Sequence, residues 1–245
     1  MVRNLKLTLE YDGTEFHGFQ RQRGMRTVQG ELERCFSRLL GEPIKVIGAG
    51  RTDAGAHATG QVANFGTSRP IPAGRLREVL NAALPADVKV QRCQQAPPGF
   101  HARRDARSRT YRYRVIERPA PSPMLGRYAL VVPGRLEVGL MRRGAERLLG
   151  RRDFRAFQGG GAEAKGTERT LMRLACRRAG PVITVTAEAD SFLYQMVRIM
   201  VGALLAVARR EIEPEAVVAA LAARERRLLP GPAPACGLCL VKVSY

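Results

Sequence analysis

Residues 48–65 read Gly-Ala-Gly-Arg-Thr-Asp-Ala-Gly-Ala-His-Ala-Thr-Gly-Gln-Val-Ala-Asn-Phe. Residues 44–47 before this stretch and its own last five residues are strand-like, so it predicts two strands joined by a glycine-rich loop that carries Arg51, Asp53 and His57. Glycine lets a backbone turn tightly or approach a ligand closely. Such loops often carry chemistry, but an aspartate on a turn also commonly bonds only its own backbone. The loop alone leaves both interpretations of Asp53 open.

The glycine spacing of this loop does not fit the common nucleotide-binding motifs. After Gly48 and Gly50 the third glycine of a dinucleotide fingerprint comes too late, and a strand follows where that motif needs a helix. No Gly-Lys-Ser or Gly-Lys-Thr occurs anywhere in the chain, which excludes a Walker-type phosphate loop.

The composition points to a globular protein with a polyanionic partner. The chain has 245 residues, 45% of them hydrophobic, which is enough for one large domain or two small ones. Its formal net charge is +19, and such an imbalance favours binding to nucleic acid. A coding bias toward arginine explains why lysine is rare, but it does not explain the shortage of carboxylates.

The sequence also bears on the cellular compartment of the protein and on whether it binds a metal. The first residues lack the apolar region of a signal peptide, and the longest apolar stretch, 192–208, is short and interrupted for a membrane span. Five cysteines, an odd number, argue against a disulfide framework and for a reducing cytoplasm. Cys236 and Cys239 form a lone Cys-x-x-Cys without further clustered ligands, so we expect packing residues and no metal site.

The pattern of strands and helices predicts two similar halves, 1–105 and 106–245. In the first half, alternating Leu5, Leu7 and Leu9 predict a strand, and Thr27 is expected to cap a helix. With the strands near 44–48, 61–65 and 88–93 and a helix around 76–83, the order is β-α-β-β-α-β, which is ferredoxin-like.

The second half varies the same order. Strands are expected near 110–116, 128–132, 171–177, 182–189 and 238–243, and helices near 138–149, 193–210 and after Pro214. The sequence therefore predicts an α+β protein of two ferredoxin-like (RRM-like) halves. Because no sequence repeat is visible, the duplication rests on element order alone.

A basic stretch with tyrosines crosses from the first half into the second. Six arginines lie between positions 103 and 114, and arginine grips phosphate and stacks on bases. On a strand, Tyr111 and Tyr113 share one face while Arg112 and Arg114 share the other. The face is either part of a nucleic-acid site, where tyrosine stacks on a base, or a solvated basic surface over tyrosines in the core. The net charge favours the first interpretation.

The helix predicted at 193–210 contains one arginine in an apolar surrounding. It is apolar nearly all round, so it should be largely buried, with Arg198 in its middle. A buried guanidinium needs an anion, and Asp53 is a candidate partner. We therefore expect the two side chains within salt-bridge distance. The alternative is that Arg198 extends to solvent.

These residues resemble a known family. Gly50-Arg-Thr-Asp-Ala-Gly-Ala-His-Ala is similar to the catalytic motif of TruA-type tRNA pseudouridine synthases. The resemblance continues in order along the chain, through the segments that begin at Tyr11, Thr27, Asn81, Phe100, Tyr111, Asp153, Phe192 and Gly237. Two departures, Ala56 for the usual Val and Phe19 for the common Trp, do not touch the proposed chemistry.

The resemblance implies the pseudouridine synthase fold, an extended, mainly antiparallel sheet flanked by helices. It also implies conversion of uridine to pseudouridine at positions 38, 39 and 40 of the tRNA anticodon stem-loop by a cytoplasmic homodimer, without cofactor or metal. Asp53 would be the nucleophile, attacking either the ribose or the base. Tyr111, Arg51 and Arg198 would bind the substrate.

A second hypothesis from another class is a non-catalytic RNA-binding protein with two RRM-like units. The aromatic-and-glycine signature expected of that fold is absent from the sequence. Nothing in such a protein requires Arg-Thr-Asp-Ala-Gly, so the enzyme is favoured.

Overall fold

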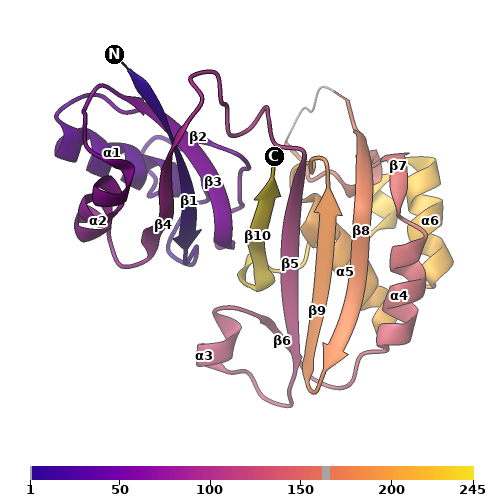
Figure 1. The fold of residues 1–245 in the computed structure, drawn as a ribbon. Helices are drawn as coiled ribbons and strands as arrows, with labels where there is room; N and C mark the ends of the chain where they lie inside the picture. Colours follow the sequence, from indigo (N-terminus) through magenta and orange to yellow (C-terminus); the bar gives the residue numbers. More distant parts are fainter. Residues whose placement is uncertain (1, 162–165) are drawn as a thin grey trace. The chain divides into compact units, whose positions relative to one another are not determined.

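The computed structural model describes residues 2–161 and 166–245, which form two compact units (Figure 1). Unit 1 contains the chain up to Arg107 together with Cys239–Tyr245. Unit 2 contains Ser108–Leu238. The last strand therefore belongs to the unit formed by the start of the chain.

Unit 1 is a sheet with two helices. Its strands follow the order β4-β1-β3-β10, and the short β2 also pairs with β3. β3 runs antiparallel to β1 and β2 and parallel to β10. The elements are β1 (Arg3–Tyr11), α1 (Val28–Leu40), β2 (Ile47–Gly48), β3 (His57–Thr67), α2 (Ala73–Ala83), β4 (Val88–Ala96) and β10 (Leu238–Ser244).

The sequence pattern explains the core of unit 1. Leu5, Leu7 and Leu9 alternate along β1 and are completely buried, and each such leucine stabilises the fold by about 1.5–3 kcal/mol. Helix α1 begins as predicted at Thr27, whose Oγ1 accepts a hydrogen bond from the Gly30 N–H at 3.3 Å. The cap sets the direction in which α1 leaves the residues before it.

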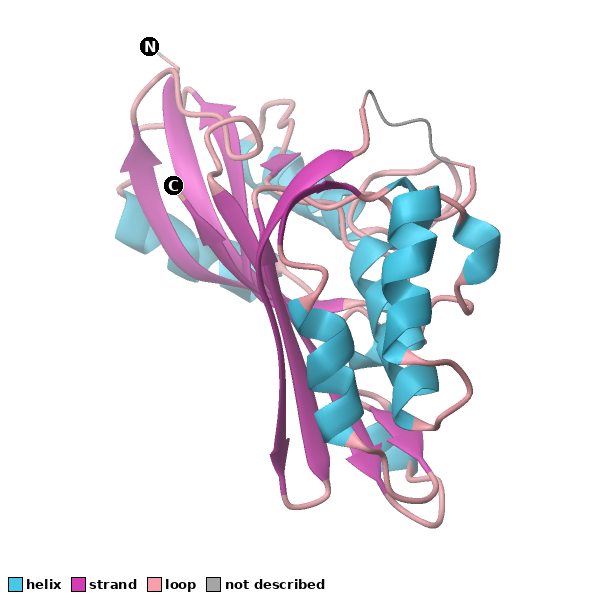
Figure 2. Ribbon diagram, turned by 90° about the vertical axis from the view of Figure 1, so that its right-hand side faces the viewer, coloured by secondary structure: helices cyan, strands magenta, loops and turns pink. Residues whose placement is uncertain are grey.

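Unit 2 is an antiparallel sheet in the order β5-β9-β8-β7, with β6 parallel to β5. Helices α4, α5 and α6 lie on one side of this sheet (Figure 2). The elements are β5 (Ser108–Glu117), α3 (Pro123–Gly126), β6 (Leu130–Val132), α4 (Val138–Glu146), β7 (Gly150–Asp153), β8 (Glu168–Ala179), β9 (Val182–Ala189), α5 (Met196–Ala208) and α6 (Pro214–Ala223). Short 3₁₀ turns occupy Arg155–Phe157, Arg226–Leu228 and Ala235–Gly237.

The predicted α+β class is confirmed, with mainly antiparallel strands and flanking helices. The predicted helices are present, although their ends differ by a few residues. The prediction that His57 lies on the loop is wrong, because His57 is the first residue of β3. Its strand begins early because Cys239 and Leu240 of β10 pair with His57 and Ala58. Strand β7 and helix α3 were not predicted.

Two further features of the described residues concern the helices and the cysteines. Over residues 2–161 and 166–245, no helix is both long and apolar enough to cross a membrane. All five cysteines are free thiols, and burial raises the pKa of Cys93 to about 11 and that of Cys176 to about 12. These two thiols therefore stay protonated at neutral pH.

Candidate active site

Asp53 lies on the loop of residues 49–56 that joins β2 to β3, named here the β2–β3 loop. Its side chain is partly buried, whereas Arg51 is exposed. The Ala56 N–H donates to the Asp53 carbonyl oxygen at 3.1 Å, closing a tight turn. Gly55, two residues after Asp53, has φ +77°, a conformation that glycine adopts without strain. Asp53 is thus the first residue of a well-defined turn.

Gln61 of β3 fixes the start of the β2–β3 loop. Its side chain is fully buried, and its amide donates to the Gly50 carbonyl at 2.8 Å and accepts from the Gly50 N–H at 3.3 Å. The Tyr11 hydroxyl lies 2.8 Å from Thr52 Oγ1 and accepts from Gln61 at 3.4 Å. Burial raises the pKa of Tyr11 far above its usual value, so its hydroxyl stays protonated. This buried network holds the residues immediately before Asp53.

The segment of residues 12–19, named here the glycine arm, lies against the β2–β3 loop. Phe19 N–H donates to the Thr52 carbonyl at 3.1 Å, and Gly55 N–H donates to the Phe16 carbonyl at 3.2 Å. These two bonds hold the loop on both sides of Asp53. The approach is close enough that a Cβ on Gly18 would lie 2.8 Å from the Thr52 carbonyl oxygen, and Gly18 also has φ +87°.

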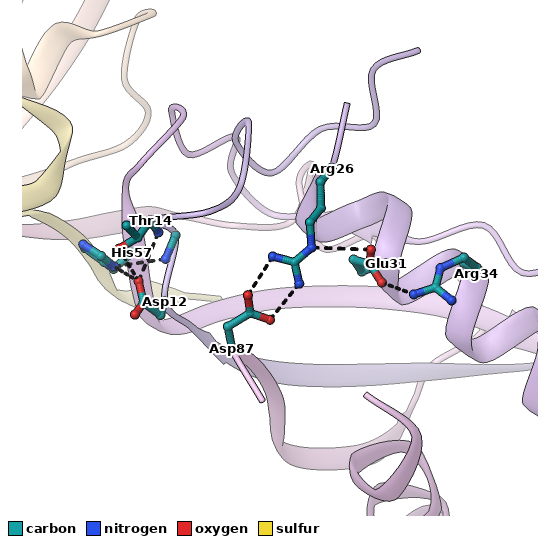
Figure 3. Close-up of polar contacts among 8 residues, drawn as sticks. Asp12, Thr14, Arg26, Glu31, Arg34, His57 and Asp87 are labelled. Carbon is teal, nitrogen blue, oxygen red and sulfur yellow. Dashed lines mark hydrogen bonds and ion pairs between the residues drawn. The ribbon is translucent and has the colours of Figure 1, made fainter. Parts of the chain in front are cut away.

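The imidazole of His57 contacts the start of the glycine arm (Figure 3). The Gly13 N–H donates to His57 Nδ1 at 3.0 Å, and Asp12 Oδ1 lies 3.2 Å from the same nitrogen. Asp12 Oδ1 also accepts from the backbone N–H of Thr14 at 3.0 Å and from its hydroxyl at 2.6 Å. His57 and Asp12 together define the turn at which the chain leaves β1.

Arg26 joins an ion-pair network (Figure 3) to the glycine arm. Arg26 forms a bidentate pair with Asp87 at 2.7 and 3.0 Å, and its Nε lies 3.7 Å from Glu31. The guanidinium also stacks over the Phe16 ring, 4.2 Å from the centroid. Glu31 in turn pairs with Arg34. The hydrogen bonds that Arg26 donates to Asp87 raise the pKa of Arg26, so its guanidinium stays charged.

Arg51 lies in a positively charged surrounding. Partial desolvation, and secondarily the positive charge of Arg103, lowers the pKa of the Arg51 guanidinium. Arg103 follows Ala102, which is fully buried and packs in one cluster with Ala49 and Val62. The exposed guanidinium of Arg51 on the β2–β3 loop suits a phosphate group of a nucleic acid.

The backbone of Ala102 is held on both sides. Its N–H donates to Asn64 Oδ1 at 2.8 Å, and its carbonyl accepts from the Tyr245 hydroxyl at 2.8 Å. Tyr245 packs on Phe100 with ring centroids 5.0 Å apart, and Lys6 Nζ lies 3.9 Å from the centre of the Tyr245 ring. The basic stretch that begins at Phe100 is thus anchored to unit 1.

Tyr111 of β5 lies in unit 2, and its predicted face is confirmed. Tyr111 and Tyr113 are buried, whereas Arg112 and Arg114 are exposed. The Tyr111 ring meets the Phe192 ring edge-on, with centroids 5.2 Å apart. Tyr113 is completely buried and donates its hydroxyl to the Pro234 carbonyl at 2.8 Å. Of the two tyrosines, Tyr113 is therefore a core residue.

Arg198 lies on α5, also in unit 2, and is partly buried. The prediction of an otherwise buried helix is confirmed, since nearly all its other residues are buried. Arg198 Nε donates to the Ala233 carbonyl at 2.7 Å, and the Ala233 N–H donates to the Arg198 carbonyl at 2.9 Å. This reciprocal contact was not predicted. The pairing of Arg198 with Asp53 stays a prediction.

The site contains residues that the sequence reasoning did not single out. Tyr11, Gly13, Thr52 and Gln61 shape the β2–β3 loop, and His57 was noted only as a member of it. The available signal was the Tyr11-Asp-Gly segment, which was quoted only for the family resemblance. Within residues 2–161 and 166–245, no group of three or more His, Cys, Asp or Glu side chains is arranged to hold a metal ion.

Comparison with known proteins identifies the family of the chain. A family described as tRNA pseudouridine synthase matches residues 8–105 and 145–245. The chain therefore belongs to the tRNA pseudouridine synthase family, whose members are isomerases. It is 40% identical to tRNA pseudouridine synthase A of Acetivibrio thermocellus, over 100% of both chains. It is 43% identical to the protein of the same name from Moorella thermoacetica, over 98% of this chain and 99% of the relative. It is 41% identical to that of Chlorobaculum tepidum, over 99% of this chain and 98% of the relative.

Proposed function

We propose that this enzyme isomerises uridine to pseudouridine in the anticodon stem-loop of tRNA, at positions 38, 39 and 40, with Asp53 as the nucleophile. The observation that supports this role is the position of Asp53. It is the first residue of a tight turn, and the Thr52 carbonyl before it and the Gly55 N–H after it are both bonded to the glycine arm. A nucleophile held in this way needs little reorganisation before attack.

The reaction balances without an external reagent. The N1–C1′ bond of uridine breaks, the uracil turns over, and a C5–C1′ bond forms. The C5 proton leaves and N1 gains a proton, so product and substrate have the same atoms. The carboxylate of Asp53 adds either to C1′ or to the base and departs in the last steps, and both routes use the same ionised side chain.

We assign substrate-binding roles to Arg51, Tyr111 and Arg198 by the family resemblance. An exposed guanidinium that also feels the positive charge of Arg103 suits a phosphate contact for Arg51. Tyr111 offers an aromatic face to a uridine taken out of its stack, a step that costs a few kcal/mol. We further propose that the first half carries the catalytic loop, that the enzyme acts as a homodimer, and that it works in the cytoplasm, with which its five free thiols agree.

The test is substitution of the proposed nucleophile. Asp53→Asn is nearly isosteric and removes the carboxylate, so pseudouridine formation on an unmodified tRNA transcript should be abolished while tRNA affinity is retained. Glu78→Gln on α2 removes an exposed carboxylate paired with Arg75 and serves as the matched control. Turnover by Asp53→Asn close to that of the wild type would contradict the assignment. Pseudouridine outside positions 38, 39 and 40 would contradict the proposed specificity.

A further inference from the structure

The hydrogen bond between Gly13 and His57 raises the question of which ring nitrogen of His57 is protonated. Two groups lie close to His57 Nδ1, the Gly13 N–H at 3.0 Å and Asp12 Oδ1 at 3.2 Å. A neutral ring with its proton on Nε2 accepts from Gly13. A ring protonated on Nδ1 can instead only donate, to Asp12. The two bonds therefore exclude each other.

Hydrogen-bond accounting favours the neutral ring. Gly13 is buried, and its N–H donates to His57 Nδ1. A buried N–H without an acceptor costs about 1–3 kcal/mol. Asp12 Oδ1 already accepts two hydrogen bonds from Thr14. Only the neutral state satisfies both the Gly13 N–H and the Asp12 oxygen.

Gly13 is in contact with the turn that carries Asp53. A Cβ on Gly13 would lie 1.9 Å from the Ala56 carbonyl oxygen, so the two backbones touch. Ala56 in turn closes the Asp53 turn through its N–H. A displacement of Gly13 is therefore transmitted to the backbone of Asp53 through one intervening residue.

We propose that His57 is a positioning residue for the reaction. Its neutral imidazole, with Nδ1 as acceptor, holds Gly13 against Ala56 and thereby fixes the turn that orients the Asp53 carboxylate. The inference rests on the proposed role of Asp53. It assigns to His57 no contact with the tRNA and no proton transfer to the substrate.

Two substitutions at one position test this inference. His57→Asn places an amide oxygen near the position of Nδ1, so it keeps the acceptor and cannot become charged. His57→Leu keeps similar bulk and removes the acceptor. We expect His57→Leu to lower kcat by about tenfold or more, since small misplacements in a site cost up to about a hundredfold. KM for tRNA should change little, and His57→Asn should restore most of kcat.

A spectroscopic measurement on the wild-type enzyme gives a result that does not depend on whether a variant folds. In protein labelled with ¹⁵N-histidine, the His57 ring nitrogens should show the neutral form protonated on Nε2 at pH 7. An imidazolium spectrum would overturn the inference. So would a loss of kcat in His57→Asn as large as that in His57→Leu, or a wild-type kcat in His57→Leu.

Failure of the proposed function gives a different pattern. If the wild-type enzyme forms no pseudouridine, or if Asp53→Asn remains active, the reaction or the nucleophile is wrongly assigned. If the wild type is active, Asp53→Asn is inactive and His57→Leu keeps full kcat, only the role of His57 is wrong.

Discussion

The backbone of Gly13 and the carbonyl of Ala56 are in direct contact, so closely that a side chain at position 13 would lie 1.9 Å from the Ala56 oxygen. Gly13→Ala must therefore separate the glycine arm from the β2–β3 loop. We expect kcat for pseudouridine formation to fall by at least about tenfold, because the turn of Asp53 moves with Ala56. Steady-state assays on a tRNA transcript measure this. Gly74→Ala, on the exposed face of α2 where nothing lies within 4 Å, is the control and should remain fully active.

Tyr111 provides a test of base stacking. If its ring stacks on the target uridine, Tyr111→Leu should lower turnover by roughly one to two orders of magnitude, since an aromatic face contributes about 1–3 kcal/mol per base. Tyr111→Phe keeps the ring and its edge contact with Phe192, and so reports on the hydroxyl alone. Single-turnover rates of both variants separate these effects. Wild-type rates in Tyr111→Leu would show that the residue serves only the core.

The net charge of +19 predicts that phosphate contacts dominate tRNA affinity. For each contact, log K should fall with log salt concentration with a slope of about −0.7 to −0.9. Filter binding or fluorescence anisotropy between low and physiological salt gives this slope. Arg51→Gln should reduce its magnitude by about one contact. An affinity that does not respond to salt would exclude this mode of binding.

Glu117 of β5 predicts a pH dependence of stability. Burial alone would raise its pKa, but hydrogen bonds from Arg178, one of them at 2.8 Å, and from the Leu136 N–H more than offset burial and hold the pKa below its usual value. A lowered pKa contributes stability above the usual value for glutamate, and this contribution is lost as the pH falls through the folded-state pKa.

Glu117→Gln should therefore lower the free energy of unfolding by roughly 1–3 kcal/mol near pH 7. The difference from the wild type should shrink as the pH falls below the usual glutamate range. Denaturant titrations at neutral and acidic pH measure it. Glu215→Gln removes an exposed carboxylate 3.3 Å from Arg147 and should change stability little at any pH. A deficit in Glu117→Gln that does not change with pH would contradict the assignment of the lowered pKa.

Local sequence patterns predicted most of the fold, but they did not predict where β3 begins. Alternating leucines identified β1, and Thr27 identified the start of α1. The first residues of β3 lack such a pattern: His57, Ala58 and Gly60 are buried and Thr59 is exposed, and the strands that pair with them come from distant parts of the sequence. A Cβ on Gly60 would lie 2.2 Å from the Val241 carbonyl of β10, a contact between residues that are far apart in the sequence.

The residues of the candidate site also fall into those that the sequence indicates and those that only the folded chain brings together. Asp53 and Arg51 were found from the glycines around them, because a glycine-rich loop is visible in the sequence. The contacts of Gln61 with Gly50 and of Arg26 with Asp87 were not found, because each joins residues from elements that only the folded chain brings together. The carbonyl of Ala233 that binds Arg198 is a backbone group, and side-chain patterns cannot point to it.

The pairing of β10 with β3 has a consequence for biosynthesis. A ribosome releases the chain from its first residue onward, and domains generally begin to fold as they emerge. Unit 1 cannot be completed in that way, because its sheet includes β10 from the end of the chain. Cys239 and Leu240 of β10 pair with the first two residues of β3. The strand edge next to the β2–β3 loop therefore stays open during translation. The sheet of unit 1 is therefore complete only after all of unit 2 has been synthesised.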